Sequence, residues 1–208
     1  VRTEAEIKAD RSKLGNGDPL AYWDVRVKAN SYADLSGRGY SIHRTEEGPN
    51  FQANDTYKLC KELSAMPKTL EAWICFPADM DPATRGGIIL GNYPGKWNGV
   101  FNFEIGTKGQ PRLYYKALDG VVTDVVFNQV NVYTGQWVHL TLVQDVTGNA
   151  LRCYVDGVLA QTISKTVPSY TPGGQLCVGS DLRSGNEQYL SNGMVASFDS
   201  LTISGKNF

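Results

Sequence analysis

The sequence predicts an all-β fold, an antiparallel two-sheet β-sandwich of the jelly-roll kind with one short helix. From about residue 69 onward, short segments alternate apolar and polar residues with the period of two that is typical of strands. Gly, Asn, Asp and Pro separate these segments at short intervals. The 208 residues also include 22 Gly and 11 Tyr, a composition that favours strands and turns.

The N-terminal part of the chain has a different character. Residues 1–20 are polar and end in Gly-Asn-Gly-Asp-Pro, so we interpret them as a linker or an edge segment. Residues 21–208 are long enough for one β-sandwich domain. The chain begins "VRTEAEIKAD", with neither Met nor a signal-peptide pattern, and we expect it to be a fragment of a longer protein.

The predicted elements follow from local patterns. Residues 54–67 are the one segment with helical spacing, with Asn54 or Asp55 as N-cap and Pro67 as stop, which predicts a two-turn helix. We predict ten strands after it, over 69–76, 86–92, 99–106, 112–118, 122–128, 137–145, 150–157, 158–164, 174–180 and 194–203. The side chains expected to be largely buried are Trp73, Phe103, Leu140, Leu142, Val155 and Phe198.

The stretch "GQWVHLTLVQDVTGNALRCYVDG" (135–157) contains Trp, His and Asp, which are common in hydrolytic sites. Its pattern nevertheless predicts a hairpin: Val138, Leu140 and Leu142 share one face of the first strand, and "DVTGN" reverses the chain. Asp156-Gly157 is a short-turn signal for a second hairpin. Asp156 is therefore interpreted as a turn residue.

Composition and charge exclude several classes of function. The net charge is −1 and basic residues do not cluster, so nucleic acid is not expected as a partner. No apolar run approaches the roughly 18 residues of a membrane span, so no membrane insertion is expected. The cysteines lack a CxxC pair, and those in the strand segments are expected to be buried thiols, with one or two disulfides as the alternative; they are Cys60, Cys75, Cys153 and Cys177.

The segment "GQWVHLTLVQDVTGNALRCYVDGVLAQT" resembles the "W-x-H … D … L-x-x-Y-V-D-G" block of laminin-G-like domains, within the concanavalin-A-like lectin and glucanase group. "TLEAWICFP", "GVFNFEIGTKGQPRLYY", "GQLCVGSD" and "NGMVASFDSLTIS" resemble further blocks in the right order, and "YADLSGRGY" (32–40) resembles an early turn. The resemblance covers about residues 20–204. It implies a jelly-roll sandwich and, in most members, binding of carbohydrates or proteins.

Catalysis is not expected from these residues. The resemblance implies that hydrolases of this group carry Glu-x-Asp-x-x-Glu on one strand, and that motif is absent here. It also implies a structural role for the residue at the position of His139, which we expect to be packed and hydrogen-bonded. A glycosidase is kept as the least favoured alternative.

A carbohydrate site is predicted instead. Tyr93, Trp97 and Asn98 lie in "GNYPGKWNG" (91–99), a surface-loop sequence with two aromatic rings that could stack on a sugar. If Phe101, Phe103, Ile105, Leu113 and Tyr115 point into the core, the outer face of the same sheet carries Glu104, Arg112 and Tyr114 together with Asn102 and Lys116.

The same residues also have structural interpretations that involve no ligand. Trp97 could fold back over the sandwich edge, and Arg112, Glu104 and Lys116 could be ordinary cross-strand ion pairs on a solvated face. The polar loop "SDLRSGNEQYLSNG" (180–193) is a weaker second candidate for the site.

The resemblance further implies a structural Ca²⁺ ion in many relatives. Asp34, in an early turn, and Asp199, in the last strand segment, match the positions that would hold it. The predicted function is a non-catalytic carbohydrate-binding module of a larger secreted or cell-surface protein, bacterial in type, with a glycan ligand. The alternative from another class is a protein-interaction or adhesion domain.

Overall fold

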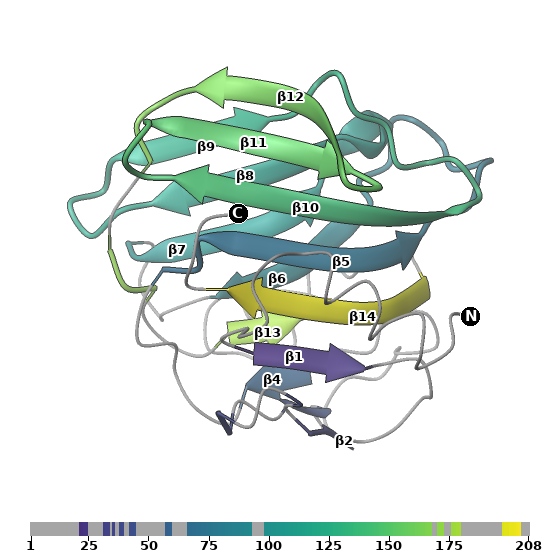
Figure 1. Ribbon diagram of the computed structural model, residues 1–208, viewed down its shortest axis with the longest axis horizontal. Helices are drawn as coiled ribbons and strands as arrows, with labels where there is room; N and C mark the ends of the chain where they lie inside the picture. The colour runs from purple at the N-terminus through teal and green to yellow at the C-terminus, as the bar shows by residue number, and fades with distance from the viewer. Residues whose placement is uncertain are drawn as a thin grey trace.

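The computed structural model describes residues 21–24, 31–33, 35, 38–39, 42–44, 57–59, 66–92, 98–167, 170–172, 176–179 and 197–204. Figure 1 shows two antiparallel sheets, one in front of the other. Within the described residues, the front sheet runs in the order β1 (Ala21–Asp24), β14 (Ser197–Ser204), β5 (Thr69–Cys75), β10 (Trp137–Asp145), β11 (Ala150–Val155) and β12 (Val158–Ser164).

The second sheet lies behind it and contains eight described strands. Their order is β2 (Ser31–Tyr32), β3 (Ile42–Arg44), β4 (Tyr57–Leu59), β13 (Leu176–Val178), β6 (Gly87–Asn92), β7 (Val100–Ile105), β8 (Pro111–Lys116) and β9 (Val122–Val126). All the pairings between described strands are antiparallel. The predicted two-sheet sandwich is confirmed.

Each of the ten predicted strand segments overlaps one strand of the structure, from β5 to β14. The sequence did not predict the short strands β1 to β4, which have two to four residues each. Segments this short carry too few residues to display a period of two, so only their partners in the sheet define them.

The helix predicted over 54–67 is wrong where the structure describes that segment. Residues Tyr57–Leu59 form β4, which pairs with β3 on one side and with β13 on the other. A two-turn helix gains little by itself, because its first turn fixes several residues for one hydrogen bond. Two ladders of backbone hydrogen bonds to neighbouring strands therefore override the weak helical spacing. A short 3₁₀ turn, Thr107–Gly109, connects β7 to β8.

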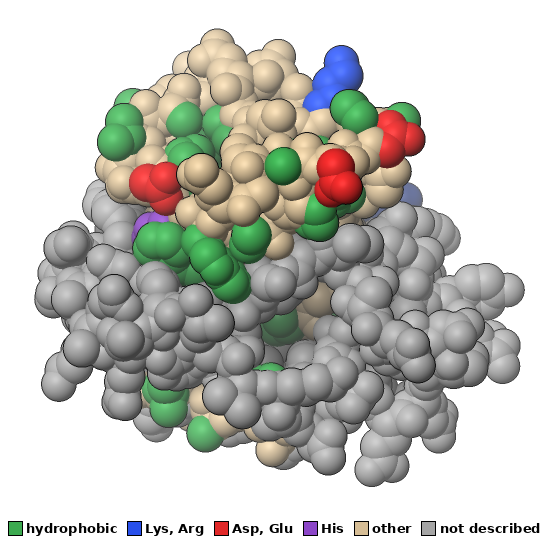
Figure 2. Space-filling view, turned by 90° about the vertical axis from the view of Figure 1, so that its right-hand side faces the viewer, with side chains coloured by type: hydrophobic (Ala, Val, Ile, Leu, Met, Phe, Trp, Pro, Cys, Tyr) green, Lys and Arg blue, Asp and Glu red, His purple; other side chains and the backbone are tan. Residues whose placement is uncertain are grey.

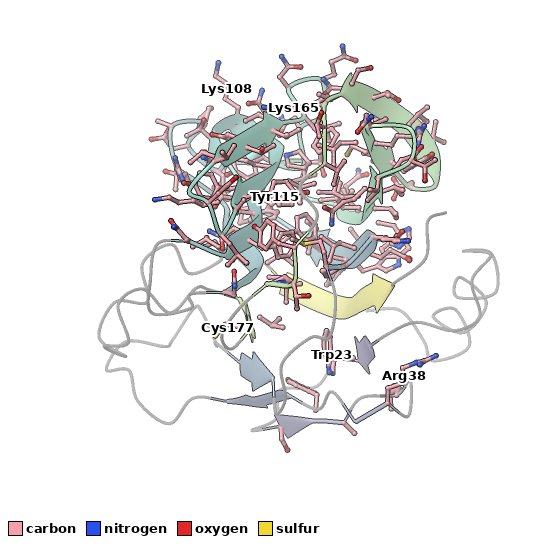
Figure 3. The ribbon with its side chains drawn as sticks, turned by 90° about the vertical axis from the view of Figure 1, so that its left-hand side faces the viewer. Trp23, Arg38, Lys108, Tyr115, Lys165 and Cys177 are labelled. Atoms are coloured by element: carbon pink, nitrogen blue, oxygen red, sulfur yellow. The ribbon has the colours of Figure 1, made fainter. Side chains whose placement is uncertain are left out.

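The core lies between the two sheets, and strand parity decides which residues enter it. The front sheet contributes Leu70, Ala72 and Ile74 from β5 and Val138, Leu140 and Leu142 from β10. The second sheet contributes Phe101, Phe103, Ile105, Leu113 and Tyr115, which are all fully buried. Figure 3 shows Tyr115 between the two sheets. The parity predicted for β7, β8 and β10 is confirmed.

Two members of the expected core are placed differently. Trp73 is only half-buried, because it alternates with Ala72 and Ile74 and so lies on the outer face of β5. Val155 is half-buried at the edge of the core. Phe103, Leu140 and Leu142 are fully buried as predicted, whereas the side chain of Phe198 lies outside the described residues.

Strand parity also decides which cysteine side chains enter the core. Cys153 points inward from β11 and is fully buried, and burial raises the pKa of its thiol to about 12. Cys75 shares the outer face of β5 with Trp73 and is half-buried, contrary to the expectation of a buried thiol. Cys177 in β13 is buried, and Cys60 lies outside the described residues.

The described part of the chain contains no helix that is long and apolar enough to cross a membrane. The segment 1–20, predicted as a linker or edge segment, lies outside the described residues.

Candidate functional site

The outer face of β7, β8 and β9 brings together the polar side chains that the sequence predicted for a site. The register of the three strands arranges them in rows across the sheet. In one row Arg112 lies between Glu104 and Val126, and in the next Tyr114 lies between Asn102 and Asp124. These two rows define what we call the β7–β9 face, and they confirm the predicted sharing of a face by Glu104, Arg112 and Tyr114.

Arg112 is the centre of the charge network on this face. Its Nε and Nη2 atoms donate hydrogen bonds to Oδ1 and Oδ2 of Asp124, both at 2.8 Å. Its Nη1 atom donates to Oε1 of Glu104, on the opposite neighbouring strand. The Nη1 atom of Arg85, just before β6, lies 3.5 Å from the same Glu104 oxygen. One guanidinium group therefore bridges carboxylates on two strands.

The network shifts the titration of both partners. The hydrogen bond from Arg112 is the largest of the effects that lower the pKa of Asp124, against the opposing effect of its partial burial. The hydrogen bond to Asp124 likewise raises the pKa of Arg112, with Glu104 adding to the effect. The side chain of Glu104 is almost fully buried, whereas that of Asp124 is 44% exposed. Asp124 is thus the carboxylate of the pair that meets solvent.

Tyr114 supplies the aromatic ring of the β7–β9 face. It is half-buried, and the guanidinium carbon of Arg112 lies 5.3 Å from the centre of its ring, a cation–π contact. Its hydroxyl group makes no hydrogen bond to any residue that the structure describes. An aromatic ring that contacts a cation and has a polar hydroxyl group is suited to bind a ligand that has both apolar and polar parts.

The loop between β6 and β7 is attached to the same sheet. Asn92, at the start of this loop, is hydrogen-bonded through its side chain to residues at the end of the loop. Its Nδ2 atom donates to the carbonyl of Gly99 at 2.8 Å, and its Oδ1 atom accepts from the amide of Phe101. Asn98 is exposed and donates to the carbonyl of Leu118 at 3.1 Å, in the turn between β8 and β9. The base of this loop therefore adjoins the hairpin that carries Tyr114. The predicted sugar-binding residues Tyr93 and Trp97 lie outside the described residues.

The outer face of the front sheet has a different character. The ring of His139 stacks on Trp73, with centroids 4.9 Å apart, and its Nε2 atom lies 3.4 Å from Oε2 of Glu71. Asp156 exchanges two hydrogen bonds of 2.9 Å with the backbone of His139, one through its own amide and one through Oδ1. These are contacts of a packed residue, in keeping with the scaffold role expected for His139.

Asp156 and Gly157 form the turn between β11 and β12, both with positive φ, 51° and 80°. This is the left-handed pair of a two-residue hairpin turn, and the prediction that Asp156 is a turn residue is confirmed.

Figure 2 views one end of the sandwich, where hydrophobic side chains of the described residues lie in small groups among polar and acidic ones.

The residues expected to hold calcium are only partly placed. Asp199 occupies the irregularity in β14 between Phe198 and Ser200, where the pairing with β5 shifts by one residue. Its side chain and the whole of Asp34 lie outside the described residues. Among the residues that the structure describes, no three His, Cys, Asp or Glu side chains lie close enough together to hold a metal ion.

Sequence reasoning missed Asp124, although a signal for it was present. In "VTDVV" the buried residues are Thr123 and Val125, so the same alternation places Asp124 on the outer face. What the sequence did not specify was the register of β9 against β8, which sets Asp124 opposite Tyr114 and within reach of Arg112.

The fold that carries the β7–β9 face is a two-sheet antiparallel β-sandwich. The sequence model of a laminin G family within the concanavalin A-like lectin/glucanases superfamily matches residues 47–206 of the chain. The chain therefore belongs to this family. The resemblance noted in the sequence is confirmed. No curated protein sequence matches the chain.

Solved structures share this fold at low sequence identity. The botulinum neurotoxin serotype D ligand-binding domain, in complex with N-acetylneuraminic acid, is 12% identical with a TM-score of 0.62, over 93% of this chain and 48% of that one. Domain 4 of AbnA, an extracellular GH43 arabinanase from Geobacillus stearothermophilus, in complex with arabinotriose, is 16% identical with a TM-score of 0.59, over 89% and 91%. The binding domain of Paraclostridial Mosquitocidal Protein 1 is 13% identical with a TM-score of 0.57, over 92% and 50%. The chain thus spans about half the length of the toxin domains that it resembles.

Proposed function

We propose that this chain is a non-catalytic carbohydrate-binding domain of a larger secreted or cell-surface protein. The observation that carries the proposal is the β7–β9 face, where the half-buried ring of Tyr114 lies beside Arg112 and the exposed carboxylate of Asp124. An aromatic ring covers the apolar face of a sugar, while fixed charged groups accept and donate hydrogen bonds to its hydroxyls.

The β6–β7 loop supports the same proposal. Asn92 and Asn98 attach its two ends to the sheet and to the β8–β9 turn, next to the β7–β9 face. We propose that Tyr93 and Trp97 of this loop contact the glycan together with Asn98, Glu104, Arg112 and Tyr114. A loop held at both ends loses less conformational freedom on binding than a loose one.

The solved structures with a similar fold are compatible with this role. Two of the similar structures contain a bound saccharide, N-acetylneuraminic acid in one and arabinotriose in the other, and one of these belongs to an enzyme that is extracellular. Those ligands belong to those proteins. For this chain, they favour a glycan as the class of ligand and a place outside the cell.

The charge network argues against a glycosidase. Glycoside hydrolysis by a carboxylate pair needs one carboxylic acid that keeps its proton near neutral pH, which requires a raised pKa. Arg112 instead lowers the pKa of Asp124, and it binds Glu104 through a third hydrogen bond. Asp124, with its lowered pKa, is suited to accept hydrogen bonds from a ligand and not to donate a proton to it.

A structural Ca²⁺ ion is part of the proposal. Asp34 and Asp199 are the residues proposed to bind it, because carboxylate oxygens are hard ligands that calcium prefers. The ion would stabilise the folded chain, because it binds only the native state.

One observation favours a protein partner as the second candidate. Large apolar side chains are exposed in the β8–β9 turn and along β9, the last described strand of its sheet, namely Leu118, Val121, Val122 and Val126. Exposed apolar residues on an edge strand are typical of protein-interaction surfaces.

The test is a screen of the chain on a glycan array that includes neutral and acidic oligosaccharides, followed by calorimetry with each glycan that binds. We expect micromolar to millimolar dissociation constants, because an open sheet face leaves much of a sugar hydrated. Binding that free sugar abolishes supports the carbohydrate proposal. A protein ligand whose binding persists in excess sugar, with no glycan bound, would favour the second candidate.

A further inference from the structure

The carboxylate of Asp124 on the β7–β9 face can accept more hydrogen bonds than those it receives from Arg112. Each carboxylate oxygen accepts one hydrogen bond from Arg112, and a carboxylate oxygen can accept two. With 44% of its side chain exposed, Asp124 has lone pairs that face solvent. The guanidinium fork also fixes the plane of the carboxylate, so its free acceptors have a defined direction.

The strand register places this carboxylate beside the aromatic ring. Phe127 donates to the carbonyl of Pro111, and Ala117 donates to that of Val121, so the hydrogen-bonded pairs of the β8–β9 ladder are the odd-numbered ones. Tyr114 and Asp124 therefore form a non-hydrogen-bonded pair, in which the two side chains approach each other most closely.

Asn102 is the neighbour of Tyr114 on β7, and its side chain has an oxygen without a hydrogen-bond partner among the described residues. This atom is Oδ1, and Asn102 is 3% exposed. The position of Gly91 on the adjoining strand leaves room for this amide, since a Cβ atom there would lie 2.7 Å from Oδ1. Among the described residues, the row thus contains an amide oxygen and a phenol without hydrogen-bond partners and a carboxylate with free acceptors.

We infer that Asp124 binds the ligand directly, accepting a hydrogen bond from a hydroxyl group of a saccharide whose ring lies against Tyr114. The inference rests on the proposed carbohydrate function. The fork of Arg112 uses the lone pairs of the two carboxylate oxygens that point the same way, so the lone pairs that stay free point apart, and each can accept from a separate hydroxyl group. The ligand class is therefore a saccharide with free hydroxyl groups at the edge of the ring that meets Tyr114.

The charged groups around Asp124 hold it ionised and in place. Arg112 contacts both of its oxygens, Lys165 donates to its backbone carbonyl at 2.9 Å, and Arg85 lies on the far side of Glu104. Lys116 shares the outer face of β8 with Tyr114. Arg112 is occupied by two carboxylates, and the exposed carboxylate of Asp124 next to the ring is an acceptor, which fits hydroxyl groups.

The experiment pairs protein variants with modified ligands. The variant Asp124→Asn removes one acceptor and the charge, and Asp145→Asn is the matched control, because Asp145 pairs with Arg152 at 2.9 Å on the other sheet. Calorimetry is run with arabinotriose, xylotriose, cellotriose, mannotriose and lactose, and with the per-O-methylated form of each saccharide that binds. Circular dichroism checks that both variants are folded.

We expect Asp124→Asn to weaken binding of the unmodified saccharides at least tenfold and Asp145→Asn to leave it unchanged. O-Methylation should weaken binding to the wild-type chain to a similar degree, and Asp124→Asn should then cause little further loss. A merely structural role of Asp124 would reduce affinity for both forms alike, which would overturn the inference. Equal binding by wild type and Asp124→Asn would overturn it too, with the carbohydrate function intact. Absence of binding to any saccharide, on these probes and on the array, would overturn both.

Discussion

The hydroxyl group of Tyr115 in β8 donates a hydrogen bond of 2.6 Å to Oε1 of Gln144 in β10, across the interior of the sandwich. The Nε2 atom of Gln144 in turn donates to the carbonyl of Pro67, just before β5. Both side chains are fully buried. This chain of polar contacts connects the two sheets at a point where the core is otherwise apolar, and burial raises the pKa of Tyr115 well above that of a free tyrosine.

Replacement of Tyr115 by Phe should lower the free energy of unfolding by about 1–3 kcal/mol, because it leaves Oε1 of Gln144 buried without a donor. Urea denaturation of the purified variant measures the loss. Tyr114→Phe, one residue earlier on the opposite face, is the control and should be neutral in stability. Equal effects of the two substitutions would contradict the role assigned to the Tyr115–Gln144 bond.

Leu140→Ala should cost about 2–5 kcal/mol, since Leu140 is fully buried in the core and its loss leaves a cavity. Val158→Ala provides the comparison, because Val158, the first residue of β12, is 70% exposed and its truncation should change stability little. Chemical denaturation curves for the two variants decide the matter. A cost below about 1 kcal/mol for Leu140→Ala would mean that the core relaxes around the site.

The ion pair of Asp124 with Arg112 predicts a dependence of stability on pH. The pKa of Asp124 is lower in the folded chain than its ordinary value of about 3.9. The pair therefore stabilises the fold fully above that ordinary value, and the contribution disappears as the pH falls through the folded pKa. Melting temperatures of wild type and Asp124→Asn should converge as the pH falls below about 4. A constant gap between them over this range would show that the ion pair contributes nothing to acid sensitivity.

Trp97→Ala should weaken glycan binding at least tenfold, about 1.4 kcal/mol, with little change in melting temperature. The reason is that an exposed ring in a Gly- and Pro-rich loop recovers hydrophobic and stacking energy when it covers a sugar. Tyr114→Ala tests the sheet side of the same site and should have an effect of similar size. If Trp97→Ala unfolds the domain instead, the ring belongs to the core and the loop over 180–193 becomes the next candidate.

Addition of Ca²⁺ to chelator-treated protein should raise the melting temperature, because an ion that binds only the native state stabilises it. Asp199→Asn should remove most of that shift, since it deletes one hard ligand. Differential scanning calorimetry with and without millimolar Ca²⁺, and with Mg²⁺ as the specificity control, makes the measurement. The absence of any shift in the wild type would eliminate the ion.

Local patterns in the sequence were sufficient for the long strands. Alternation along β10 places Leu140 and Leu142 in the core, and the Asp156-Gly157 turn is encoded by the two residues that adopt it. The same alternation in β7 and β8 predicted which face carries Glu104, Arg112 and Tyr114. These features depend on residues two or a few positions apart, and a linear sequence displays such spacing directly.

Tertiary structure alone decided the features that depend on register and on sheet partners. Tyr57–Leu59 is a strand because β3 and β13 flank it, although its spacing suggested a helix. The outward direction of Trp73, by contrast, follows from its alternation with Ala72 and Ile74 in β5, a local pattern that the expectation of a buried Trp73 overlooked. Asp124 meets Arg112 and Tyr114 only through the alignment of β9 with β8. A shift of one residue in that alignment would turn every side chain of β9 to the other face, and no pattern within β9 itself determines where its partner begins.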